Sequence, residues 1–268
     1  MRLNNITLRK VQLKELEILL EVKRICEKYN ISYFLYAGTL LGAVRHKGFI
    51  PWDDDIDIAM MREDYFRFLK VAPAEISSDF FVEAPQTTPN YVYSYCKVKA
   101  NGTIFMEQCT SKLSIHQGVW IDIFPIDNIR CVNLPYLKIK KNMINIWQTG
   151  VDFRNGITQI TKPTSRLFFY LMGQIYKDKM IFQKEHRMCM DNRKETQYVL
   201  DYNTIYGYTR STFPAKMFQE KALYSFEGYQ FTGPKDYDLM LTTIYGDYWQ
   251  LPPEEKRYSE HGIIQCEI

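Results

Sequence analysis

The residues Trp52-Asp53-Asp54-Asp55-Ile56-Asp57 place four carboxylates within six positions. Because successive side chains of a strand point to opposite faces, Asp55 and Asp57 are expected on one face and the isoleucines that follow them on the other. Two carboxylates a few ångströms apart repel each other unless a proton or a cation lies between them. Oxygen ligands of this kind favour Mg²⁺, with Mn²⁺ as an alternative. The stretch therefore predicts an acidic strand end that holds a divalent cation.

A third acid lies in similar surroundings later in the chain. The tripeptide Ile121-Asp122-Ile123 again sets one carboxylate between two apolar residues, a pattern typical of a half-buried strand. If the two strands are neighbours, Asp122 joins Asp55 and Asp57. Such a cluster suits phosphoryl transfer, in which catalysis is mainly positioning and charge neutralisation. We therefore take these three aspartates as the candidate catalytic and metal-binding residues.

Two other interpretations of the acidic stretch have to be weighed. An EF-hand loop that starts at Asp53 would need glycine at its sixth position and glutamate at its twelfth. The chain has Ile58 and Asp64 at these positions, so an EF-hand is excluded. The second interpretation, a solvated acidic loop that caps the following helix, stays open from this stretch alone.

Gly38 and Thr39 lie between a predicted buried strand, residues 31–36, and a predicted short helix that stops at Gly48. A glycine lets the backbone approach a ligand closely, and the amides at a helix start can hold phosphate oxygens. The order strand, Gly-Thr, Asp-x-Asp and a later strand aspartate resembles the plan of the nucleotidyltransferase superfamily. This resemblance predicts an α/β (α+β) fold, with a nucleotidyltransferase-like mixed sheet, flanking helices and a helical insertion.

A closer resemblance covers most of the chain. Residues 33–46, YFLYAGTLLGAVRH, and 48–57, GFIPWDDDID, resemble the signature of the LicD family. That family holds bacterial phosphocholine transferases and is related to fukutin-type ribitol-phosphate transferases. Residues 118–127, GVWIDIFPID, resemble its second block. The stretches that resemble its C-terminal blocks are 226–228, 234–237, 245–248 and 251–257.

The LicD resemblance implies a cytoplasmic enzyme that transfers phosphocholine from CDP-choline to a hydroxyl of a cell-surface glycan or teichoic-acid precursor and releases CMP. By the same resemblance, Asp55 and Asp57 hold Mg²⁺ and Asp122 is the third carboxylate. Gly38 and Thr39 contact the nucleotide phosphates. Asp122 is also our candidate for the base, because a metal ligand near the attacking oxygen is placed to take its proton.

Three alternative functions stay open. Ribitol, glycerol and ethanolamine donors would carry the same CDP portion as CDP-choline, so the sequence does not determine the donor alcohol. A true nucleotidyltransferase of the same fold would release pyrophosphate instead of CMP. A non-catalytic, metal-dependent glycan-binding module belongs to a different class, but it would not need three clustered carboxylates beside a phosphate-type Gly-Thr.

Four further residues are candidates for substrate binding. Arg45 is placed to stabilise the leaving CMP, or is a surface cation at the C-terminal end of a helix. Trp52 contributes an aromatic face for a quaternary ammonium, or packs the turn beside it. Lys97, with Lys99, meets phosphate or lies on an exposed strand face. His261 is a candidate acid or base near the chain end.

Composition sets the limits for these assignments. Of 268 residues, 46% are hydrophobic and 24% are charged, which is typical of a folded globular protein. The net charge of +3 is too small to predict nucleic-acid binding. The six cysteines show no zinc or disulfide spacing, which favours a reducing cytoplasm. We expect no leader or membrane-spanning segment, and a cytoplasmic location, with the inner face of the membrane as an alternative.

The middle of the chain differs from the rest. Residues 131–200 hold 12 Lys/Arg and 5 Asp/Glu, a local balance of +7. We divide the chain into a catalytic core, 1–130, a basic helical insertion, 131–200, and a C-terminal return that completes the core, 201–268. The insertion is interpreted as ordinary helices, as a surface for a phosphate-rich acceptor, or as a contact with anionic lipid. Its predicted apolar side holds Phe168, Leu171, Met172 and Ile175.

Overall fold

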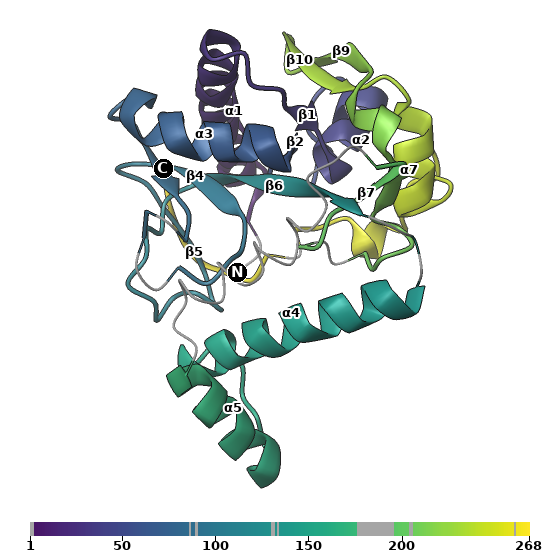
Figure 1. Cartoon of the computed structure of the whole chain (residues 1–268). Coiled ribbons are helices and arrows are strands. Elements are labelled where there is room, and N and C mark those ends of the chain that lie inside the picture. Colours follow the sequence, from purple (N-terminus) through teal and green to yellow (C-terminus); the bar gives the residue numbers. More distant parts are fainter. Residues whose placement is uncertain are drawn as a thin grey trace.

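The structure, a computed structural model, describes residues 3–85, 87–88, 91–129, 132, 134–175, 196–203, 206–259 and 261–268. Its centre is a sheet in which the strands follow the order β1-β2-β6-β4-β3, with β7 beside β6 and β8 beside β7 (Figure 1). Strand β2 runs parallel to β6, whereas the other described pairs are antiparallel. The strands are β1 Phe34–Leu35, β2 Asp57–Met61, β3 Phe80–Glu83, β4 Cys96–Ala100, β6 Trp120–Ile129, β7 Tyr198–Leu200 and β8 Thr212–Pro214.

Helices flank this mixed sheet, and two small antiparallel sheets lie beside it. The flanking helices are α1 Asn5–Lys28, α2 Ala37–Arg45, α3 Arg62–Glu75 and α7 Tyr237–Tyr245. The small sheets pair β9 Lys221–Phe226 with β10 Tyr229–Pro234, and β5 Ile104–Glu107 with β11 Ile263–Glu267. Short 3-10 turns occupy Ala215–Phe218 and Glu254–Lys256. The predicted α/β architecture with a mixed sheet is confirmed.

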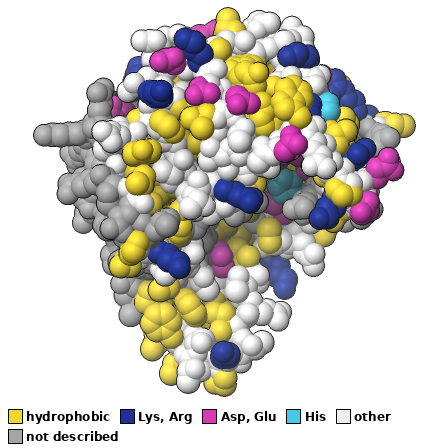
Figure 2. All heavy atoms as spheres, turned by 90° about the vertical axis from the view of Figure 1, so that its right-hand side faces the viewer, with side chains coloured by type: hydrophobic (Ala, Val, Ile, Leu, Met, Phe, Trp, Pro, Cys, Tyr) yellow, Lys and Arg dark blue, Asp and Glu magenta, His cyan; other side chains and the backbone are white. Residues whose placement is uncertain are grey.

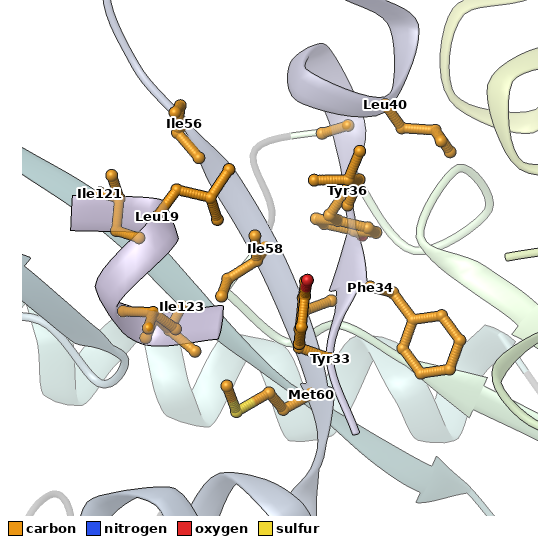
Figure 3. Close-up of a cluster of buried hydrophobic side chains, with 14 of the residues drawn as sticks. Leu19, Tyr33, Phe34, Tyr36, Leu40, Ile56, Ile58, Met60, Ile121 and Ile123 are labelled. Carbon is orange, nitrogen blue, oxygen red and sulfur yellow. The ribbon is translucent and has the colours of Figure 1, made fainter. Parts of the chain in front are cut away.

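Helix α1 packs its apolar side on the sheet beneath the acidic strand end. The Asn4 side chain accepts a hydrogen bond from the Thr7 backbone N–H at 2.9 Å and so caps the helix start. Leu19 of α1 lies among four buried isoleucines, which are Ile56 just before β2, Ile58 of β2, and Ile121 and Ile123 of β6 (Figure 3). Ile56 and Ile58 are fully buried, whereas Asp55 and Asp57 are partly exposed, as the predicted alternation requires.

Two prolines do not end or start elements where the sequence pattern predicts. Pro125 is expected to close its strand, yet β6 continues through it to Ile129. The backbone N–H of Asp122 donates toward the β2 edge of β6, so by alternation the ring nitrogen of Pro125 faces the opposite edge, where β4 and β7 lie. On that edge, β4 pairs with β6 only up to Ile123 and β7 only from Asp127. Pro125 lies between these two pairings, so no ladder hydrogen bond is lost for want of its N–H. Pro234 is expected to open a helix, because proline favours the first helical position. Instead it is the last residue of β10, and α7 starts at Tyr237.

The C-terminal residues return to the core, and two helices extend away from it. Strand β11 pairs with β5, and α7 lies near α2 (Figure 1). Helices α4 Leu134–Arg154 and α5 Pro163–Ile175 pack against each other below the sheet. Residues 130–131, 133 and 176–195 of the predicted insertion and its junction, and the Ile175 side chain, lie outside the described part. Within that part, no helix combines the length and the low polarity that crossing a bilayer requires.

The buried ion pair between Arg62 and Asp127 joins the start of α3 to β6, and its loss should destabilise the fold. The guanidinium donates to both carboxylate oxygens, at 2.7 and 2.6 Å, and Asp127 is 1% exposed. Arg62→Met leaves a buried carboxylate unpaired, so the free energy of unfolding should fall by about 3–5 kcal/mol in urea titrations. Lys14→Met, which breaks an exposed pair with Glu17, should cost at most about 1 kcal/mol. Equal losses in the two variants would contradict this role.

Candidate active site

Three adjacent strands bring two acids and a lysine side by side. The parallel register pairs Asp57 of β2 with Asp122 of β6, and the antiparallel register pairs Asp122 with Lys97 of β4. Residues paired across a sheet point to the same face, so these side chains form one polar row. The expected meeting of the two acidic strands is therefore present in the sheet.

The loop before β2 adds three more carboxylates. Oxygens of Asp53, Asp54 and Asp55 all lie within 4.8 Å of one another. Asp54 is 1% exposed, and its Oδ2 atom has no hydrogen-bond partner. The loop is held in place because the Gln12 side-chain amide donates to the Asp53 backbone oxygen at 2.8 Å. A buried carboxylate oxygen without a donor, beside two further carboxylates, fits a divalent cation with oxygen preference.

Three of these carboxyl groups, those of Asp53, Asp55 and Asp57, resist ionisation. Burial, followed by the charges of Asp55 and Asp122, raises the pKa of Asp57 well above its ordinary value. Burial and the charges of Asp55 and Asp54 act in the same way on the pKa of Asp53. Burial also raises the pKa of Asp55, although His261 opposes the shift. A bound cation would remove this cost, which again favours a metal site.

Gly38 and Thr39 connect the start of α2 to the acidic strand. A Cβ at Gly38 would lie 3.1 Å from Asp53 Oδ2, so a larger residue there would push the Asp53 carboxylate back by a few tenths of an ångström. The Thr39 hydroxyl accepts a hydrogen bond from the Asp57 backbone N–H at 2.7 Å. Thr39 thus fixes the strand that carries Asp57, a role that the Gly-Thr pattern alone does not reveal. Whether the two residues touch phosphate stays a prediction.

His261 reaches the acidic loop from the far end of the chain. Its Nδ1 atom lies 2.9 Å from Asp54 Oδ1, and its Nε2 atom 3.9 Å from Asp55 Oδ2. The pairing of β11 with β5 holds His261 there. Burial lowers the pKa of His261, but the hydrogen bond to Asp54 and the charge of Asp55 outweigh it and raise the pKa to about 10. The imidazole is therefore a cation at neutral pH.

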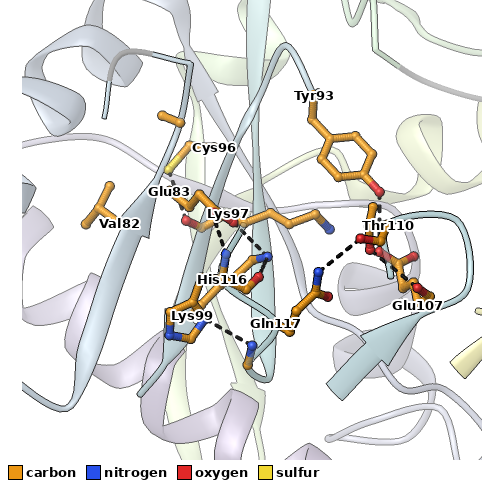
Figure 4. A network of polar contacts seen from close by, with 12 residues as sticks. Val82, Glu83, Tyr93, Cys96, Lys97, Lys99, Glu107, Thr110, His116 and Gln117 are labelled. Carbon is orange, nitrogen blue, oxygen red and sulfur yellow. Dashed lines mark hydrogen bonds and ion pairs between the residues drawn. The ribbon is translucent and has the colours of Figure 1, made fainter. Parts of the chain in front are cut away.

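The two lysines of β4 are buried ion-pair partners, so an exposed strand face is the wrong interpretation of them. Lys97 and Lys99 are 3% and 4% exposed. Lys97 Nζ lies 2.7 Å from Asp122 Oδ1. Lys99 Nζ lies 2.7 Å from Glu83 Oε2, and Figure 4 shows these two residues in the polar network around His116. Lys97 faces the acidic cluster, whereas Lys99 faces a separate polar network around His116.

A pocket of about 430 Å³ lies beside the acidic loop. Its wall includes Arg45, Trp52 and Tyr245, together with residues 247, 248 and 250–253. The Tyr245 hydroxyl also lies 4.0 Å from the position of a Cβ at Gly38, so the pocket adjoins the Gly-Thr turn. Arg45 donates to the Tyr248 backbone oxygen at 2.8 Å, and the Arg257 guanidinium lies 5.5 Å from the Trp52 ring. Cations and aromatic faces of this kind suit a nucleotide.

Glu15 is a member of the site that the sequence pattern does not reveal. It lies on α1 with no exposed surface, and neither carboxylate oxygen has a hydrogen-bond partner. Burial, and then the charges of Asp55 and Asp54, raise its pKa well above the ordinary value. In a helix that holds several Lys and Glu residues, no sequence signal distinguishes the buried Glu15 from its solvent-exposed neighbours. Asp127, at the end of the stretch 118–127, is paired with Arg62.

Comparison with known proteins gives this geometry a context. Residues 30–172 match the family described as LicD/FKTN/FKRP, nucleotidyltransferase domain. The lipopolysaccharide cholinephosphotransferase LicD of Haemophilus influenzae is 31% identical over 274 residues, covering 97% of each chain. The chain belongs to the LicD family.

More distant relatives match over shorter stretches. Human ribitol 5-phosphate transferase FKRP is 39% identical over 54 residues, 20% of this chain and 11% of its own. An uncharacterised protein of Rickettsia typhi is 46% identical over 57 residues, 21% of this chain and 18% of its own. The resemblance seen in the sequence is thus confirmed, as is the prediction of a phosphotransferase of the LicD type and its relation to fukutin-type enzymes.

The pairing of His261 with Asp54 should be visible in a histidine titration. In the metal-free protein, NMR should place the pKa of His261 near 10, and Asp54→Asn should lower it toward the ordinary 6.5. Because the folded-state pKa lies above the unfolded one, the stabilisation is complete below pH 6.5 and is lost as pH rises toward 10. The stability difference between wild type and Asp54→Asn should therefore shrink from pH 6 to pH 9. An unchanged His261 pKa in the variant would refute the pairing.

Proposed function

We propose that the protein transfers phosphocholine from CDP-choline to a hydroxyl of a cell-surface glycan precursor, with release of CMP. The observation that carries this proposal is the carboxylate cluster, which joins a Gly-Thr turn and a nucleotide-sized pocket. The similarity to a lipopolysaccharide cholinephosphotransferase over nearly the whole chain supports choline as the alcohol and a lipopolysaccharide-type glycan as the acceptor. A teichoic-acid precursor is the alternative acceptor.

Mg²⁺, or Mn²⁺ in its place, is the cofactor we propose. Asp55, Asp57 and Asp122 are its proposed ligands; Asp57 and Asp122 are paired across the sheet, and oxygens of Asp53 and Asp54 lie within 4.8 Å of an oxygen of Asp55. The ion supplies charge neutralisation on the diphosphate and the leaving group. The chain's own residues orient the reactants: Thr39 fixes the Asp57 strand, and Asp54 fixes His261.

The donor is proposed to lie across Gly38 with its cytidine in the Trp52 pocket. The α2 start at Ala37 presents backbone amides to the phosphates, as helix starts do for anions. Arg45 and Trp52 contribute a guanidinium and a ring to the pocket wall. The acceptor hydroxyl then attacks the distal phosphorus, the bond to the CMP oxygen breaks, and Asp122 takes the hydroxyl proton.

A lipid-linked acceptor is proposed to approach along α5. Leu167, Phe168, Tyr170 and Leu171 are each about half or more exposed on this helix. Figure 2 shows hydrophobic side chains gathered at the lower end of the molecule, where α4 and α5 lie. An exposed apolar helix side of this kind favours a peripheral contact with an acyl chain or a membrane surface. Of the residues predicted for this side, Phe168 and Leu171 are exposed, whereas Met172 packs inward against Val92.

Ribitol phosphate is the second candidate for the transferred group. The local similarity to FKRP, which is named a ribitol 5-phosphate transferase, favours it over glycerol and ethanolamine. Both donors share the CDP portion, so the nucleotide pocket does not distinguish them. Calorimetry with CDP-choline, CDP-ribitol and CDP-glycerol in Mg²⁺, then in EDTA, separates the alcohols. Equal affinity for all three would remove the support for choline.

Neutralising the acidic strand should abolish transfer without unfolding the protein. Asp55→Asn and Asp57→Asn each remove a ligand of the proposed ion, so CMP release from CDP-choline should fall at least about a hundredfold. Asp79→Asn, at an exposed acid outside the cluster, should keep the wild-type rate and melting temperature. Full turnover of either cluster variant would exclude the metal assignment. Pyrophosphate as product from a nucleoside triphosphate would indicate a nucleotidyltransferase.

Removing the Trp52 ring should weaken the binding of any CDP compound. Loss of one stacking face typically costs about 1–3 kcal/mol, so Trp52→Ala should raise the Kd for CDP about tenfold in calorimetry. Trp249→Ala is the matched control because Trp249 is 57% exposed and is not part of the pocket wall. An unchanged Kd in Trp52→Ala would place the nucleoside elsewhere.

A further inference from the structure

The Lys97 ammonium lies in an aromatic box formed by the rings of Tyr93, Tyr95 and Trp120. Its Nζ atom lies 4.4 Å from the ring centre of Trp120, 5.0 Å from that of Tyr93 and 5.5 Å from that of Tyr95. The same ammonium lies 2.7 Å from Asp122 Oδ1 and 2.9 Å from Oδ2. It is thus a charged group held by one carboxylate and three ring faces.

Three of the four groups around this ammonium do not fix its hydrogen-bond geometry. Ring faces attract an ammonium but, unlike a second carboxylate, impose no single hydrogen-bond geometry on it. A lysine head is a point charge on a flexible four-carbon stem, so it can exchange one anionic partner for another with little movement of the backbone. Trp120 lies two residues before Asp122 on β6 and points to the same face, so it supports the ammonium throughout such an exchange.

The charges around Lys97 are unbalanced. Among the described residues, the cluster gathers the carboxyl groups of Asp53, Asp54, Asp55, Asp57, Asp122 and Glu15. The basic groups in contact with them are Lys97 and His261, and His261 is paired with Asp54. Lys97 is therefore the cation that holds Asp122, the carboxylate beside Asp57.

We propose that Lys97 is a tethered counter-ion that competes with the divalent cation for Asp122. When the ion binds, the ammonium leaves Asp122, stays on the Trp120 face and contacts a phosphate oxygen of the donor. The inference rests on the metal site of the proposed function, but not on which alcohol the donor carries. It makes Lys97 a residue with two alternating partners, rather than a fixed phosphate ligand or a structural ion pair.

Lys99 provides the matched control. It lies two residues further along β4 on the same face, is equally buried, and lies 5.9 Å from the same Trp120 ring. Its partners, however, are Glu83 and the His116 backbone oxygen, outside the acidic cluster. A general effect of losing a buried lysine from β4 should therefore appear in Lys99→Met as well, whereas competition for the ion should not.

The experiment measures the affinity of the full-length protein for Mn²⁺ by calorimetry, with no nucleotide present. Lys97→Met should bind Mn²⁺ about tenfold or more tightly than wild type, because a positive charge next to a ligand has been removed. Lys97→Arg keeps the charge and should not tighten Mn²⁺ binding, and the affinity of Lys99→Met should be unchanged. In the Asp122→Asn background, Lys97→Met should no longer tighten Mn²⁺ binding. Melting curves identify any variant that does not fold.

A second titration follows CDP in the presence of saturating Mn²⁺. Lys97→Met should bind CDP about tenfold more weakly, because the phosphate loses a charge-assisted partner. Tighter metal binding together with weaker CDP binding is the signature that a purely structural lysine would not give. If Lys97→Met leaves the Mn²⁺ affinity unchanged or weakens it, the competition is refuted while the metal site stands. If wild type and Lys97→Met both fail to bind Mn²⁺, the metal site is wrong and the inference falls with it.

Discussion

The parallel pairing of β2 with β6 sets Asp57 beside Asp122, and the site depends on this one register. A shift of β2 by one residue would turn Asp57 toward α1 and its neighbouring isoleucines toward the ligand face. The buried isoleucines on the opposite face fix the register, since their transfer to water would cost far more than the sheet could regain by re-pairing. The apolar core under α1 therefore forces two carboxylates together against their mutual repulsion.

Positively charged side chains from distant segments of the chain partly offset that repulsion. Lys97 comes from the neighbouring strand, and His261 comes from a segment more than 200 residues away that β11 holds in place. Neither cation neutralises the whole cluster, because Lys97 contacts Asp122 and His261 contacts Asp54 and Asp55. A cluster with a residual excess of carboxylates is costly to fold, and the divalent cation proposed above would offset that cost, which is the usual compromise between stability and function.

The sequence pattern was sufficient for the parts of the site that follow local rules. Alternation alone places Asp55 and Asp57 opposite buried isoleucines, and the apolar flanks of Asp122 indicate a strand. The Gly-Thr pair is recognisable because it follows a short buried strand, although the structure places it in the first turn of α2 rather than before the helix. The resemblance to LicD then extends these local rules to a family, which the similarity over 97% of both chains confirms.

Other features depend on contacts between distant residues, for which the sequence holds no local signal. Glu15 looks like one more solvated acid of α1, and its burial follows only from the docking of that helix under the acidic loop. The aromatic box around Lys97 needs β4, β6 and the segment before β4 to meet. Pro125 breaks a strand by the usual rule, but here the strand changes partners at that position. Each case is a tertiary arrangement that overrides a local preference.

The same distinction bears on how the proposed function could extend to different phospho-alcohols. In the proposed reaction, the cluster and the Gly-Thr pair act on the diphosphate, which every CDP-linked donor shares, so these residues would be indifferent to the alcohol. Selection between alcohols would then come from side chains that reach past the diphosphate, and selective side chains of this kind are usually carried by loops rather than by a sheet. On this proposal, the charge arrangement around Asp57 and Asp122 specifies the type of reaction, while the loops that surround it are free to specify the substrate.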